Sequence, residues 1–187
     1  MAVRGSFWRF VGQDARVADK SGPLDIVAVL QQLGTQEQVR VALELATLVL
    51  PLAQLSTSGQ PEQGLSGVAD VIRGASDPVD VDAARHELWR LPEQRLHDEP
   101  EGAEWFAFGA SVAWLYAADA VTTAPSDGVV NTFKRVCDLL DAIDDELEES
   151  DLLGDLLRML ATDQIESGRL TGLAAKVERS AQLLDLD

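Results

Sequence analysis

The spacing of apolar residues restricts the fold of this 187-residue chain more than any other feature. Apolar side chains recur every three or four residues over long segments, the period that places them along one side of an α-helix. No segment shows the sustained alternation of β-branched and polar residues that is typical of a half-buried strand. The spacing therefore predicts an all-α fold.

Proline and glycine divide the helical pattern into segments with short connections. Pro23, Gly34, Pro51 and Pro78 stand at such breaks, where a helix begins, ends or turns. Between the breaks we expect about seven or eight helices, and short connections make neighbouring helices mostly antiparallel. We therefore expect a single-domain bundle over residues 23–187. It follows an N-terminal arm, residues 1–22, whose aromatic segment 7–11 reads Phe-Trp-Arg-Phe-Val.

Two helix starts contain residues that commonly cap helices. Thr35 with Gln38 three residues later fits a capping box. Ser126, inside a Pro-Ser-Asp-Gly turn at 125–128, is expected to cap a helix that runs to about Glu149.

The preceding segment, from Glu104 to about Ala124, is strongly apolar. Its small residues allow another helix to approach closely, which marks this helix as the centre of the fold or as half of a dimer interface. These residues are Gly109, Ala110, Ala113, Ala117 and Ala120.

The charge balance excludes several classes of function. The chain has 32 Asp and Glu against 15 Lys and Arg, a net charge of −17. A general nucleic-acid binder needs a cationic surface, and an anionic membrane repels an acidic one. The single cysteine excludes an intrachain disulfide and a Cys-rich metal site. No glycine-rich phosphate loop follows a strand, so we assign no cofactor.

The sequence also predicts the compartment. The first twenty residues lack the apolar core of a signal peptide. The most apolar stretch, residues 105–118, is shorter than the roughly 20 residues that span a bilayer. Arginine outnumbers lysine twelve to three, and Ala, Val, Gly, Leu and Asp are abundant, a composition typical of high-GC bacteria. We therefore expect a bacterial cytoplasmic protein.

A row of acids near residue 140 offers two functional interpretations. Asp138, Asp141, Asp145 and Glu148 fall on one side of their predicted helix. Carboxylates at this spacing can share a divalent cation, so one alternative is a metal-dependent all-α hydrolase that acts on a phosphate ester. One helix supplies only half of such a site, and no matching row lies elsewhere. We therefore assign no catalytic or metal-binding residue.

The second interpretation is attraction of a basic protein. Residues 138–187 contain 14 acids and four bases, a net charge of −10, and such a field speeds the encounter with a cationic partner. By analogy of composition, we expect a non-enzymatic protein of the kind represented by acidic, helical bacterial immunity or antitoxin-like inhibitors. A homodimeric scaffold built on the Ala-rich helix is a further alternative. The expected contact residues are Asp141, Asp144, Asp145, Glu148 and Glu149.

Asp119 and Cys137 are two further residues whose role, functional or structural, the sequence raises. Asp119 shares a helix face with Tyr116 and apolar residues, where an ionised carboxylate needs a partner. We expect it to hold a tyrosine, an arginine or a helix start, with an acid of raised pKa in a pocket as the alternative. Cys137 is expected to pack as a small apolar residue.

Overall fold

The computed structural model confirms the all-α fold. It describes residues 26–55, 63–74, 80–86, 88, 102–147, 150–161 and 167–184. Every regular element in these ranges is helical. The N-terminal arm and its aromatic segment lie outside the described residues.

The helices follow one another with short connections where the chain is described. Residues 80–86 are also helical. The bounds are α1 (Ile26–Gln32), α2 (Thr35–Leu48), the 3-10 helix η1 (Leu50–Leu55), α3 (Gln63–Gly74), α5 (Ala103–Thr122), α6 (Pro125–Glu146), α7 (Leu152–Ala161) and α8 (Ser167–Leu184).

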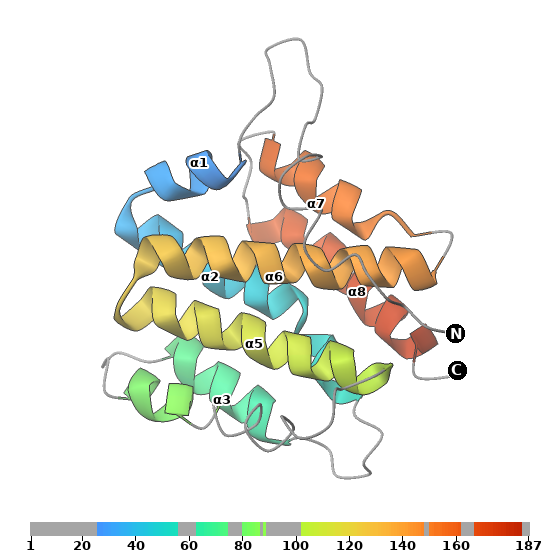
Figure 1. Ribbon diagram of the computed structural model, residues 1–187, viewed down its shortest axis with the longest axis horizontal. Coiled ribbons are helices and arrows are strands. Elements are labelled where there is room, and N and C mark those ends of the chain that lie inside the picture. Colours follow the sequence, from blue (N-terminus) through green and yellow to red (C-terminus); the bar gives the residue numbers. More distant parts are fainter. Residues whose placement is uncertain are drawn as a thin grey trace.

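Helix α5 forms the centre of the bundle. It packs against α6, α2, η1 and α3, and it runs side by side with α6 in front of α2 (Figure 1). Its buried residues lie on most of its circumference, because the aliphatic core reaches it from several neighbouring helices. No described helix combines the length and the apolar character that a bilayer crossing requires.

Small residues of α5 allow close packing against α6 of the same chain. At Gly109 a Cβ atom would lie 2.5 Å from Leu139 Cδ2 of α6. At the other end of the pair, a Cβ at Gly128 of α6 would lie 2.4 Å from the backbone nitrogen of Ala120. Both distances are shorter than any ordinary carbon contact, so glycine permits the approach of the two helices. The sequence left open whether this helix is central to the fold or half of a dimer interface, and the structure places it at the centre of the bundle.

Both predicted caps are wrong in detail. Gly34 is the N-cap of α2, and Thr35 is its first helical residue. Gln38 is buried and its Nε2 donates to the carbonyls of Leu30 and Gln31, each at 3.2 Å. It therefore holds the end of α1 because these last carbonyls have no partner within their own helix.

Helix α6 also begins earlier than expected. Ala124 is its N-cap and Pro125 is its first residue, with no side-chain cap. Proline suits this position because it has a fixed φ and no N–H to satisfy. Ser126 is consequently inside the helix.

Candidate functional site

One side of α6 is apolar and buried, and the opposite side is acidic. Val129, Val136, Leu140 and Ile143 are fully buried. The side chain of Asp138 is 47% exposed, Asp145 is exposed and Asp141 is partly buried, as the helical period predicts. We call Asp138, Asp141 and Asp145 the acidic stripe. With a rise of 1.5 Å per residue, the stripe extends over about 10 Å.

Among the described residues the stripe has one ion pair, and it is a long one. Asp138 Oδ2 lies 3.9 Å from Arg135 Nη1, at the outer limit of an ion pair. Asp141 and Asp145 form no ion pair within the described part of the chain.

The surroundings of Asp138 and Asp141 oppose the ionisation of these two side chains. Partial burial raises the pKa of Asp138, against the opposing effect of Arg135. Partial burial also raises the pKa of Asp141, and the charges of Asp145 and Asp144 add to this shift. The charges of Asp138 and Asp141 therefore cost stability in the free protein.

Other acids of the bundle do have basic partners. Asp155 lies 2.5 Å from both Lys176 Nζ and Arg158 Nη2, and these hydrogen bonds lower its pKa. Further pairs are Asp119 with Arg85 at 2.5 Å, Asp70 with Arg73 at 2.8 Å, and Glu37 and Glu44 with Arg40. These acids stabilise the fold, whereas Asp141 and Asp145, like Glu178 of α8, form no ion pair among the described residues.

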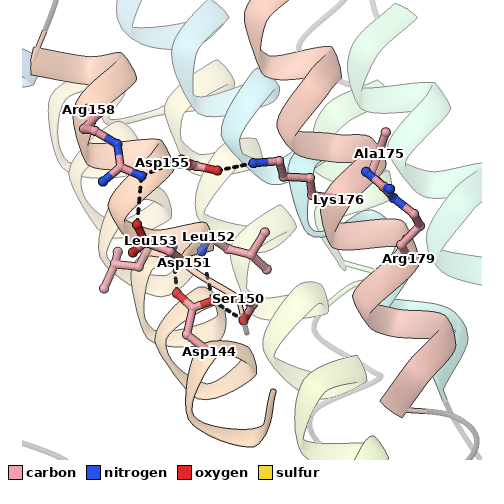
Figure 2. Close-up of polar contacts among 10 residues, drawn as sticks. All are labelled: Asp144, Ser150, Asp151, Leu152, Leu153, Asp155, Arg158, Ala175, Lys176 and Arg179. Carbon is pink, nitrogen blue, oxygen red and sulfur yellow. Dashed lines mark hydrogen bonds and ion pairs between the residues drawn. The ribbon is translucent and has the colours of Figure 1, made fainter. Parts of the chain in front are cut away.

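Asp144 belongs to the fold-serving group. Figure 2 shows its carboxylate directed at the start of α7. Oδ1 accepts hydrogen bonds from Ser150 Oγ at 2.5 Å and from the N–H of Leu152 at 2.9 Å. Oδ2 accepts from the N–H of Leu153 at 3.0 Å. These N–H groups have no partner within their own helix, and a negative charge suits a helix N-terminus.

One base of α7 and one of α8 also have acidic partners. Arg158 bridges Asp151 and Asp155, and Lys176 of α8 reaches Asp155 from the other side (Figure 2). This network joins α7 to α8 and leaves neither base directed at the acidic stripe. Glu148 and Glu149, the remaining expected contact residues, lie outside the described residues.

Asp119 and Tyr116 are both partly buried on α5. Asp119 Oδ1 accepts a hydrogen bond from Arg85 Nε at 2.5 Å, so it has the kind of partner that its apolar face requires. This pairing joins α5 to the helical residues 80–86.

Arg135 is a residue that the sequence analysis did not single out. Its side chain is only 11% exposed. The guanidinium carbon lies 5.4 Å from the ring centre of Trp105 and 6.0 Å from that of Phe108. Burial lowers the pKa of Arg135, and the two rings offset part of this cost through cation–π attraction. Helical periodicity describes one helix at a time, so it could not predict that Arg135 of α6 contacts rings of α5.

The one cysteine, Cys137 on α6, does not have the surroundings of a reactive nucleophile. Cys137 packs against the core as expected, and burial raises the pKa of its thiol well above the usual range. It is therefore protonated at neutral pH. Among the described residues, no group of three or more His, Cys, Asp or Glu is placed to hold a metal ion.

Comparisons with known proteins do not identify a relative. No protein-family model matches the chain, and no curated protein and no solved structure matches it either.

Replacing Asp144 with alanine should lower the free energy of unfolding by about 1–2 kcal/mol, because the first N–H groups of α7 lose their acceptor. Urea denaturation measures this difference. The matched control is Asp145→Ala, the exposed neighbour, which should change stability by less than about 0.5 kcal/mol. Equal effects of the two substitutions would show that Asp144 is not a cap.

Replacing Asp141 with asparagine should instead stabilise the protein at pH 7, by about 0.5 kcal/mol or 1–2 °C in Tm. The folded-state pKa of Asp141 is raised above the ordinary value of 3.8. Its ionisation therefore lowers stability as the pH rises through the folded-state pKa, and the substitution removes this loss. The advantage should disappear toward about pH 4, where the wild-type carboxyl is protonated. Thermal melting of both proteins across this range checks the sign, and a difference that does not change with pH would contradict it.

Proposed function

We propose that this chain is a non-enzymatic acidic protein that binds a basic protein partner through the outer face of α6. The observation that carries the proposal is the contrast in ion pairing. Asp141 and Asp145 have no basic partner among the described residues, whereas Asp155, Asp119 and others have theirs within the bundle. A cationic partner would supply the missing counter-charges.

The energetic cost of the stripe supports the same proposal. Partial burial and crowding of like charges raise the pKa values of Asp138 and Asp141, so these charges destabilise the free bundle. Residues that reduce stability are common where a protein binds or acts, since function requires them there. Because Asp144 is occupied by the start of α7, the proposed surface rests on Asp141 and Asp145.

An immunity or antitoxin-like inhibitor is the most concrete form of this function. Such a protein covers a basic surface of a toxin in the bacterial cytoplasm, and a net charge of −17 favours a rapid encounter. A gene for a basic toxin directly upstream of the gene for this chain would identify the natural partner.

A lysine decapeptide provides a direct test of the surface. In an NMR titration of the full chain, we expect the largest amide shifts at residues 138–146, and an affinity that falls roughly tenfold between low salt and 0.3 M salt. Binding that does not change with salt would reject the proposal. Shifts of equal size at Asp70 of α3, Asp80 and Asp82 would also reject it, since they would show no preference for α6.

A further inference from the structure

A cavity of about 310 Å³ lies on another part of the molecule, between the end of α2, η1 and α8. Its volume is at the lower end of the range typical of small-molecule sites, roughly 300–1,000 Å³. The described lining residues are Thr47, Leu50, Pro51, Leu55, Glu178, Ala181 and Gln182.

The lining combines an apolar floor with an acceptor-rich rim. Leu50, Pro51, Leu55 and Ala181 provide the apolar surface. Glu178 and Gln182 are exposed at α8, where a carboxylate and an amide oxygen can accept hydrogen bonds. None of the described lining residues is basic.

The bases nearest to Glu178 along α8 are already engaged. Lys176 Nζ lies 2.5 Å from Asp155 of α7. Arg179 Nε donates to the carbonyl of Ala175, one turn back on its own helix, at 3.2 Å. Glu178 has no ion pair in the described part of the structure. The negative charge at the rim is therefore available to a ligand.

We propose that this cavity binds a small organic ammonium compound with an apolar body. The apolar part would cover the floor formed by η1 and Ala181, and its burial would supply most of the affinity. The ammonium group would donate to the carboxylate of Glu178, a charge-assisted hydrogen bond. This site does not involve the acidic stripe, so it stands or falls separately from the function proposed above.

Hexylammonium is a suitable probe, with hexan-1-ol and hexanoate as neutral and anionic analogues of the same length. In NMR titrations of the full chain we expect saturable amide shifts at residues 47–55 and 178–182. Hexylammonium should bind about two- to fivefold more tightly than the alcohol, the range of an exposed ion pair. Hexanoate should bind most weakly.

The substitution Glu178→Gln should reduce hexylammonium affinity to that of the alcohol. The matched control is Asp82→Asn, which removes the same charge from an exposed position on residues 80–86 and should leave the affinity unchanged. Equal affinities for the three probes, shifts outside the cavity, or equal losses in the two variants would overturn the proposal.

Discussion

Replacing Gly128 with alanine should lower the free energy of unfolding by about 3 kcal/mol, the upper part of the range for overpacked sites. The new Cβ would lie 2.4 Å from the backbone nitrogen and 2.6 Å from the Cα of Ala120. A backbone cannot rotate away as a flexible side chain can, so α5 and α6 would have to separate. For a chain of this size the Tm should fall by about 6–12 °C.

The opposite result is expected for Gly172→Ala on α8. Gly172 is exposed within its helix, and a Cβ there would meet no atom within 4 Å. Alanine has the higher helix propensity, so this control should be stabilising by up to about 1 kcal/mol. Urea denaturation of both variants measures the change in the free energy of unfolding, which should be a loss for Gly128→Ala and a gain for Gly172→Ala. A Gly128→Ala variant as stable as the wild type would show that the two helices are not in close contact at this point.

Helical periodicity was sufficient for the parts of the fold that repeat locally. It predicted the apolar side of α6, the acids on the opposite side, and small residues on α5 that let another helix approach closely, as α6 does at Gly109 and Ala120. Each of these features depends only on positions three or four residues apart along one helix. Local spacing is therefore sufficient to predict them.

The features that the sequence did not reveal depend on residues far apart in the chain. An arginine was one of the three partners expected for Asp119, but which one, Arg85, lies 34 residues earlier in the chain. Arg135 lies over rings that belong to α5. Asp144 has a different role from Asp145 because the turn after α6 brings the start of α7 to its carboxylate. Such a contact depends on the path of the chain between two helices. The spacing of residues within either helix carries no information about that path.

The acidic stripe gives the other large expected effect. Replacing both Asp141 and Asp145 with lysine changes the net charge from −17 to −13 and places positive charges on the proposed surface. Affinity for the lysine decapeptide at low salt should fall at least about tenfold, equivalent to about 1.4 kcal/mol, because repulsion replaces attraction. Isothermal titration calorimetry measures this loss directly.

A second variant separates a local surface from the general charge of the molecule. Replacing Asp80 and Asp82 with lysine also gives a net charge of −13, but it alters exposed positions on another helix. If the outer face of α6 is the binding surface, this control should lose less than about threefold, because exposed charges beyond a Debye length of roughly 10 Å are largely screened. Equal losses in the two variants would mean that the peptide responds to total charge alone. The contrast between paired acids and the acidic stripe would then have no functional meaning, and the proposed partner surface would have to be abandoned.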